Sequence, residues 1–437
     1  MLKTLRDAFK IKELRKKIFY TLGMLVLIRL GSVLPIPGVD RNFFAGWFES
    51  HMGGASGFVD AITGGSLLQM SIFALNVTPY ITSSIIMQLM TIAIPKLEEM
   101  QRDGEEGRKK IASITRYVTV ALAVIESAAM AIGFGKSGLL QEYNALNVIT
   151  VIVALTAGSA VVMWIGERIT EKGIGNGISI ILVINIISRM PQDLKGLYEQ
   201  FIKGKAVAVG ALNALIILAV IVGMIVLVII LNDGIRKIPV QYAKKMQGRK
   251  FVGGQQTSIP LRVNTAGVIP IIFASSILEF PIVICSLFQV QATGFWGEVL
   301  KGMSASNWCK LSAPQYSIGL IVYILLVIFF AYFYTSITFN PMEISDNMKK
   351  QGGFIPGIRP GKPTNDYLTN ILNYIIFIGA CGLTIVGVLP FIFNGLFNAS
   401  VSFGGTSLIN IVSVILETIK QIESQMLVRN YKGFLND

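Results

Sequence analysis

Stretches of about 20 mostly apolar residues recur along the whole chain, and this is the length that a helix needs to cross a bilayer. Ten such stretches can be drawn, at 18–34, 70–94, 115–134, 147–166, 174–190, 207–231, 265–288, 315–338, 369–390 and 404–425. Only 14% of the 437 residues are charged, too few to cover a water-soluble core of this size. The pattern predicts an all-α polytopic membrane protein whose single membrane domain uses nearly the whole chain.

Positively charged residues lie mainly in the loops on one side of these predicted spans. Ten spans place both termini on the same side, which carries 29 of the 38 Lys and Arg residues, against 8 in the loops opposite. Because Lys and Arg are retained on the cytoplasmic side, we expect a cytoplasmic N-tail at 1–17 and a cytoplasmic C-tail at 426–437. This topology accounts for the net charge of +13 before any ligand is considered.

The apolar segment at 58–68 is too short to span a bilayer and contains the glycine pair Gly64 and Gly65. It follows an outside loop and leads directly into the second predicted span. A segment of this length is typical of a re-entrant or interfacial element. Non-helical backbone at membrane depth persists only when it is buried in protein or lines a cavity. The segment therefore indicates an internal funnel.

The two halves of the chain resemble each other. The second span contains Asn76 followed by a run beginning at Pro79, and the seventh contains Asn264 followed by a similar run from Pro270. Each is the second span of a five-span half, at 18–190 and 207–425, joined by an outside hinge loop at 191–206. Proline-interrupted spans at matching positions of inverted halves indicate a site at the repeat interface. The alternative is a pair of ordinary kinked helices.

Catalytic and metal-binding constellations are not evident. Cys285, Cys309 and Cys381 form no CxxC pair, and the one histidine, His51, lies in a Gly-rich loop. The glycines at 173–177 lack the Gly-Lys-Ser/Thr ending of a phosphate-binding loop. We expect neither an enzyme, nor a metal site, nor a cofactor.

Three charged residues fall within predicted spans: Arg29, Glu126 and Glu279. Ionisable groups at membrane depth are functional candidates by default. Arg29 lies near the end of its span, where a long side chain can reach the interface. For each of the three, the alternative is an isolated group satisfied by polar neighbours.

Two cytoplasmic loops are unusual. The loop 232–264 carries seven basic residues against one acid, Asp233; the basic residues are Arg236, Lys237, Lys244, Lys245, Arg249, Lys250 and Arg262. Such a loop could bind lipid headgroups, an acidic protein or RNA through phosphate attraction, or could serve orientation alone. The loop 339–368 is rich in Pro and Gly, which predicts a stiff, shaped loop of the kind that carries function.

Several motifs together resemble the SecY family, the central subunits of bacterial protein-conducting channels, nearly end to end. They are Leu34–Gly38 (LPIPG), Ser71–Leu75 (SIFAL) with Pro79 and Tyr80, Gly104–Lys110 (GEEGRKK), Ile169–Ser179 (ITEKGIGNGIS), Gly267–Pro270 (GVIP), Phe354–Gly361 (FIPGIRPG) and Phe403–Ser407 (FGGTS). The resemblance implies ten transmembrane helices in two inverted, pseudo-symmetric halves around a central, hourglass-shaped pore.

The resemblance also implies roles for particular residues. The pore constriction would use Ile81, Ile85, Leu182, Ile186, Ile272 and, from the last span, Ile409 or Asn410. The plug closing the outer funnel would be 58–68, with Phe58, Val59, Ala61, Ile62, Gly64, Gly65, Leu67 and Leu68. The lateral gate, between the second and third spans and the seventh and eighth, would include Asn76, Pro79, Ser83, Ser84, Pro270, Ser275 and Ser276. Asn410 and Glu279 depart from the family's apolar pattern.

The function implied is passage of unfolded secretory polypeptides across the bacterial cytoplasmic membrane, with release of apolar segments sideways into lipid. Expected partners are the SecE and SecG subunits, the ATPase SecA, the ribosome and its rRNA, precursor polypeptides and membrane lipid. Docking of SecA or the ribosome would use Lys244, Lys245, Arg249, Lys250 and Arg359. A secondary transporter or a non-transporting membrane scaffold would be the alternatives on composition and pattern alone.

Overall fold

The computed structural model describes residues 2–44, 46, 63–140, 142–204, 207–242, 245–247, 250–252, 256–287, 294–310, 313–397 and 405–433. Each of the ten predicted spans overlaps a helix. The first half contains α1 (Leu2–Lys10), α2 (Lys12–Val33), α4 (Thr78–Ala93), α5 (Pro95–Arg102), α6 (Glu105–Phe134), α7 (Ala145–Lys172) and α8 (Gly177–Phe201). The second half contains α9 (Val207–Asp233), α10 (Ile269–Leu287), α11 (Phe295–Met303), α12 (Ile318–Thr338), α13 (Pro341–Lys350), α14 (Lys362–Phe397) and α15 (Gly405–Gly433). Short helical turns, η1 (Gly135–Leu139), η2 (Ala305–Asn307) and η3 (Pro314–Ser317), complete the described helices.

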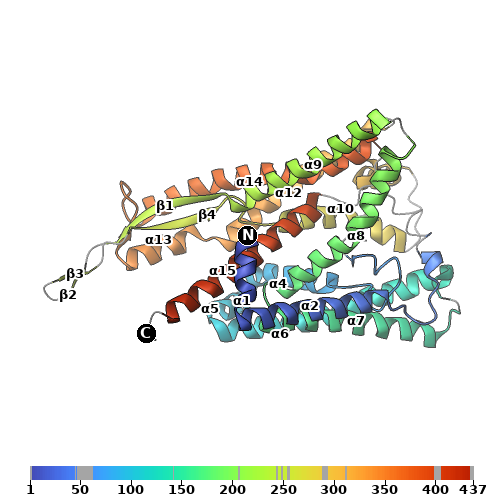
Figure 1. The fold of residues 1–437 in the computed structure, drawn as a ribbon, viewed down its shortest axis with the longest axis horizontal. Coiled ribbons are helices and arrows are strands. Elements are labelled where there is room, and N and C mark those ends of the chain that lie inside the picture. The colour runs from blue at the N-terminus through green and yellow to red at the C-terminus, as the bar shows by residue number, and fades with distance from the viewer. Residues whose placement is uncertain are drawn as a thin grey trace.

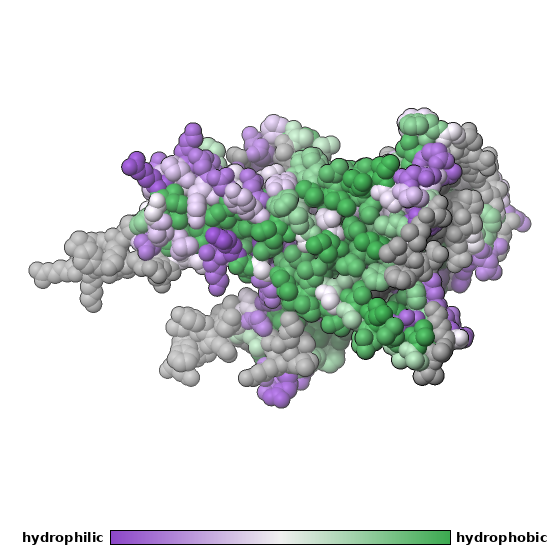
Figure 2. Space-filling view, turned by 90° about the horizontal axis from the view of Figure 1, so that it is seen from above, coloured by the Kyte–Doolittle hydropathy of each residue, from purple (hydrophilic) through white to green (hydrophobic). Residues whose placement is uncertain are grey.

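By length and composition alone, six of the described helices can cross a membrane, and α4 with α5, bent by 104°, makes a seventh. The remaining predicted spans correspond to α2, α10 and α15, which are shorter in apolar length or carry more charge. An apolar band lies across the middle of the molecule, and polar residues gather toward both ends (Figure 2). This distribution matches a bundle that crosses a bilayer.

The helices form two groups that follow the two halves of the sequence. α2, α6 and α7 lie along one edge of the molecule and α9, α12 and α14 along the other, with α8 and α15 between them (Figure 1). The halves meet where α10 contacts α6 and where α8 contacts α9 and α15. Each half has its own apolar cluster, one around Met70 and Leu155 and the other around Val327 and Ile271.

The two prolines that the sequence comparison paired lie at the start of their helices, whereas Pro281, also in the seventh span, lies inside α10. Pro79 lies in the first turn of α4, and Pro270 is the second residue of α10. Proline is favoured at this position because its missing N–H would have no partner within the helix, and its fixed φ suits the first turn. The residues before each helix are irregular turns, so both prolines mark where the helix begins.

Most of the stretch predicted as a hinge loop is helical. α8 continues past Pro191 to Phe201, so that only the last residues of 191–206 link it to α9. Hydropathy ends the apolar span near 190, but a helix continues wherever its backbone hydrogen bonds are satisfied, and a single proline removes only one of them.

The basic loop 232–264 contains a β-hairpin, which was not predicted from the sequence. β1 (Ile235–Tyr242) pairs antiparallel with β4 (Gln256–Arg262), and β5 (Gly353–Phe354) from the second loop pairs with the other edge of β1. The strands β2 (Lys245–Gln247) and β3 (Lys250–Val252) pair farther out. The hairpin projects from one end of the helical bundle (Figure 1).

The inner face of this hairpin packs on the loop 339–368. Ile238, Val240 and Leu261 are buried in one cluster with Met348 of α13 and Leu368 of α14. Alternate residues of a strand point to the same face, which explains why Ile238 and Val240 are buried while Lys237 and Pro239 are exposed. The loops 232–264 and 339–368 therefore form one folded unit.

Candidate translocation pathway and docking surfaces

The described part of the predicted plug, Thr63–Leu68, is an irregular turn buried inside the protein. Phe58, Val59, Ala61 and Ile62 lie outside the described residues. Ser66 donates its hydroxyl to the carbonyls of Thr63 at 2.7 Å and Phe73 at 3.0 Å, and Ser71 donates to the carbonyl of Ser66 at 3.2 Å. Side-chain hydroxyls thus replace the hydrogen bonds that a helix would provide. Leu67 is buried and Leu68 half-buried.

Asn76 joins this turn to the start of α4. The residue is fully buried, has φ of +49°, and accepts a hydrogen bond from the N–H of Val77 at 2.9 Å. Its Nδ2 donates to the carbonyl of Thr63 at 3.3 Å, and its own carbonyl accepts from Ser159 of α7 at 3.2 Å. One turn into α4, the buried Ser83 donates to the carbonyl of Pro79 at 2.7 Å, and Ser84 is half-buried.

Asn264 has an equivalent place before α10. Its Nδ2 donates to Oδ1 of Asn232 in α9 at 2.9 Å, and Asn232 donates in turn to Oγ of Ser413 in α15 at 2.7 Å. Pro270 is buried, Ser275 donates to the carbonyl of Ile271, and Ser276 is exposed. The two asparagines that the sequence comparison paired therefore both make side-chain hydrogen bonds to other segments just before a candidate gate helix. The bonds of Asn76 are buried, and that of Asn264 is partly buried.

The predicted constriction residues are only partly brought together. Ile81 and Leu182 pack against one apolar cluster of the first half. Ile409 is buried in the main cluster of the second half, and Ile186 is buried on α8. The other three, Ile85, Ile272 and Asn410, are half-buried. Their role in a pore ring remains a prediction.

Arg359 is exposed at the tip of the Pro- and Gly-rich loop between β5 and α14. The buried Thr364 donates its hydroxyl to the carbonyl of Arg359 at 2.8 Å, and the buried Ser345 of α13 donates to the carbonyl of Gly361 at 3.0 Å. These two bonds fix the backbone while the guanidinium faces outward. Lys244 and Arg249 lie outside the described residues, and the backbones of Lys245 and Lys250 belong to β2 and β3.

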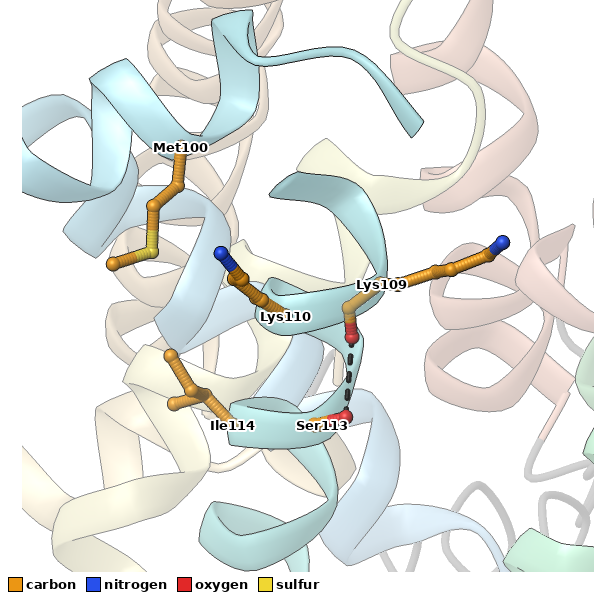
Figure 3. A pocket seen from close by; sticks show the side chains of 5 residues that line it. All are labelled: Met100, Lys109, Lys110, Ser113 and Ile114. Carbon is orange, nitrogen blue, oxygen red and sulfur yellow. Dashed lines mark hydrogen bonds between the residues drawn. The ribbon is translucent and has the colours of Figure 1, made fainter. Parts of the chain in front are cut away.

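An open pocket of about 420 Å³ lies between α5 and the beginning of α6. It is lined by Met100, Lys109, Lys110, Ser113 and Ile114, and Lys110 extends along the Met100 side while Lys109 extends away from it (Figure 3). Ser113 donates to the carbonyl of Lys109 at 3.1 Å, and Lys109 pairs with Glu105 at 3.0 Å. The pocket is cationic and shallow, with no titratable pair suited to catalysis.

An apolar groove of about 300 Å³ lies where the N-terminal helices meet the last one. Its walls come from α1, α2, α8 and α15, and include Phe9, Leu22, Val183, Ile415 and Ile419. The groove therefore spans both halves of the chain. Within the described ranges, no group of three or more His, Cys, Asp or Glu residues could hold a metal ion.

Five polar residues that make hydrogen bonds or contacts in this region were not predicted from the sequence. They are Asn185, Arg189, Asn232, Ser413 and Thr364. A signal existed for two of them. Asn185 and Arg189 lie three and seven residues after Leu182, and residues with this spacing share a helix face.

Comparisons with known proteins agree with this architecture. A family model described as SecY matches residues 71–419. The protein translocase subunit SecY of Streptomyces scabiei is 45% identical over 451 residues, covering 100% of both chains. That of Corynebacterium glutamicum is 40% identical over 98% of this chain and 99% of its own. A solved protein-conducting channel and Sec61 from the canine ribosome-channel complex each have a TM-score of 0.61 over 97% of both chains, at 18% and 17% identity.

The fold and these matches define a multi-span α-helical membrane channel that conducts polypeptides. The chain belongs to the SecY family, and it is a bacterial multi-pass channel subunit of the protein translocase, without enzymatic activity of its own. The fold class and the function predicted from the motifs are confirmed.

Proposed function

We propose that the polypeptide passes between the two halves of this chain, through a ring formed by Ile81, Ile85, Leu182, Ile186 and Ile272 with Ile409 or Asn410. The observation that supports this path best is the position of the turn Thr63–Leu68. It lies against Asn185, which is next to Ile186 on α8. A plug in this place would close the channel directly beyond its narrowest point.

A ring of branched aliphatic side chains excludes water and ions by dewetting, yet it can deform around a passing chain. Exit into lipid would occur where α4 and α6 separate from α10 and α12, and α6 and α10 are the elements in contact there. Segments would then sort by transfer free energy, because each leucine-like residue favours the bilayer by some tenths of a kcal/mol and each charge costs about 2.5–3.5 kcal/mol.

The cytoplasmic unit of hairpin and Arg359 loop would receive SecA or the ribosome, one at a time. Its projection from the bundle and its exposed Arg359 support this role. Two structural relatives are described in complexes with ribosomes, the canine Sec61 and the yeast Ssh1 channels. Arginine binds phosphate and carboxylate in a bidentate way, which suits either partner.

The apolar groove between α2, α8 and α15 suits a membrane helix of another subunit, and SecE is our candidate. A helix in this groove would contact both halves and hold them together. SecG would complete the complex, in the bacterial cytoplasmic membrane with both termini of this chain in the cytoplasm. The excess of Lys and Arg on that side supports this orientation.

Reconstitution tests the proposal. The chain would be placed in liposomes with SecE, SecA and ATP, and a signal-bearing precursor would be assayed for protease protection. We expect ATP-dependent protection that is lost with Arg359→Glu and kept with Lys362→Glu, an exposed control three residues away. Normal protection with Arg359→Glu in correctly inserted protein would contradict the docking role.

A further inference from the structure

Side chains from α2 and α8 surround the glycine pair of the plug turn. Arg29 of α2 donates from Nη1 to the carbonyl of Gly64 at 3.3 Å. A Cβ added to Gly64 would lie 2.9 Å from the Cα of Asn185 and 3.0 Å from Nη1 of Arg29. A Cβ added to Gly65 would lie 3.8 Å from Nη1 of Arg189. The turn therefore accepts a hydrogen bond from the guanidinium group of Arg29 and packs against Asn185, and it lies close to Arg189, whose Nη1 donates to Oε1 of Gln192.

The α8 residues of this contact continue the face that carries the proposed constriction. Leu182, Asn185, Ile186 and Arg189 are spaced by three, four and seven residues, so they share one side of the helix. Asn185 is fully buried and Ile186 is 2% exposed. This face is thus apolar at Leu182 and becomes polar where the plug turn lies.

The glycine pair is what allows the close approach. Gly64 and Gly65 have φ of +65° and +83°, which residues with a side chain rarely adopt. At Gly64 the missing side chain also lets the backbone reach α8 without overlap. A carbonyl is a neutral acceptor, and a guanidinium donor makes its hydrogen bond stronger than a neutral donor would.

The position of Arg29 on α2 suits its hydrogen bond to the carbonyl of Gly64, and not only a side chain that reaches the membrane–water interface. Its neighbours on the inner face of α2, Ile28 and Ser32, are 0% and 2% exposed, so this face packs against protein. The half-buried guanidinium group of Arg29 consequently reaches the plug turn beside the buried face of α2.

We propose that Arg29, Asn185 and Arg189 form an intramolecular binding site for the Gly64–Gly65 turn, and that this site holds the channel closed. The inference rests on the proposed role of 58–68 as a plug. Arg29 is a positioning residue. It holds the plug turn in place in the resting channel, and the plug turn in turn blocks the passage of ions.

The test measures the ion conductance of the resting channel in planar bilayers, and a second readout locates the plug. For the second readout, the native cysteines Cys285, Cys309 and Cys381 are each replaced by Ser. A single new cysteine is then introduced by Thr63→Cys, at a position that is 3% exposed. Labelling of that thiol by a membrane-impermeant reagent then reports release of the turn. We expect Arg29→Leu to raise the open fraction about tenfold, the effect of losing one charge-assisted hydrogen bond, and to accelerate labelling.

Two matched controls separate the binding site from general strain. Arg41→Leu removes an exposed arginine from the same predicted side and should leave both readouts unchanged. Gly64→Ala should raise conductance, whereas Gly38→Ala should not, because Gly38 has a similar φ of +78° but nothing within 4 Å of an added Cβ.

Unchanged conductance and labelling with Arg29→Leu would overturn the inference, and so would a leak without labelling, since the seal would then have failed elsewhere. Deletion of 58–68 distinguishes the proposed plug from the proposed binding site that holds it. A leak in the deletion but not in Arg29→Leu refutes only the binding site, whereas no leak in the deletion refutes the plug itself.

Discussion

Gly175 donates its backbone N–H to Oε1 of Gln421 at 2.6 Å, which joins the turn between α7 and α8 to α15. The same turn is bound to α2, because the N–H of Ile174 donates to Oγ1 of Thr21 at 3.2 Å. On α15, Gln425 accepts from Lys17 at 3.2 Å. The motif Ile169–Ser179 thus links the first half of the chain to the last helix of the second.

Replacement of Gln421 by Ala should loosen this link. The N–H of Gly175 would lose its partner, and an unsatisfied donor in a partly buried site costs about 1–3 kcal/mol. We expect faster amide hydrogen exchange in residues 169–179 and a lower thermal midpoint in detergent. Ser424→Ala, at an exposed position on the same helix, is the control, and equal exchange in both variants would contradict the link.

Gly158 is required for the packing of α7 against the turn before α4. A Cβ at this position would overlap the carbonyl oxygen of Ile72, and this backbone atom cannot rotate away. Gly158→Ala should therefore destabilise the protein by at least about 1–3 kcal/mol and reduce the amount of folded protein that can be purified.

Gly223→Ala provides the comparison, since Gly223 lies within α9 with nothing within 4 Å of an added Cβ. This variant should retain or slightly raise stability through helix propensity. Equal folded yields of the two variants would refute the packing argument.

The hydroxyl of Thr364 should control docking at Arg359 without touching the partner. Thr364→Val keeps the shape but removes the hydrogen bond to the Arg359 carbonyl, so the loop would lose its fixed backbone. Loss of about 0.5–1.5 kcal/mol corresponds to a roughly 2- to 10-fold weaker affinity for SecA. Thr364→Ser retains the donor and should bind normally; a Ser variant as weak as the Val variant would exclude the hydrogen bond as the cause.

The tie between α11 and η3 should depend on pH. Tyr316 donates to Oε2 of Glu298 at 2.6 Å and Lys301 donates to Oε1 at 3.0 Å. These bonds, that from Tyr316 first, lower the pKa of Glu298 below its usual value of 4.5. A carboxylate whose folded-state pKa is lowered contributes stability above the unfolded pKa and loses it as the pH falls through the lowered value.

Wild-type protein should accordingly melt at a higher temperature than Glu298→Gln at pH 7. The difference should shrink as the pH falls below the usual value of 4.5 and vanish once the pH is below the lowered pKa of Glu298. Tyr316→Phe removes the larger cause and should reduce the difference at pH 7. A pH-independent difference between wild type and Glu298→Gln would show that the carboxylate charge has no part in the tie.

The membrane helices could be predicted because each one is encoded locally, in a window of about 20 apolar residues. The β1–β4 hairpin was missed because its loop was interpreted through its charges, although Ile238 and Val240 are two residues apart and flanked by Lys237 and Gln241. The end of α8 was placed too early, since the helix continues beyond the apolar segment to Phe201.

The polar contacts of the pathway were beyond sequence reasoning. The partner of Arg29 is Gly64, and the partners of Asn232 are Asn264 and Ser413, which are far away in the chain. Their pairing depends on how helices of different segments are oriented to each other, and no local pattern contains that information. Pro79 and Pro270 were singled out from the sequence as matching interruptions of two spans, but their place at the start of a helix became clear only from the irregular turns before them.

Asn76 has a mechanical consequence. Because its side chain both accepts from the N–H of Val77 and donates to the carbonyl of Thr63, a shift of the first turn of α4 by more than the length of a hydrogen bond would break its bond to the turn Thr63–Leu68, which we propose as the plug. The lateral opening toward lipid and the seal against ions would therefore both depend on the side chain of Asn76. A cell that admits an apolar segment sideways would risk its ion gradients at the same moment, unless the segment itself fills the gap.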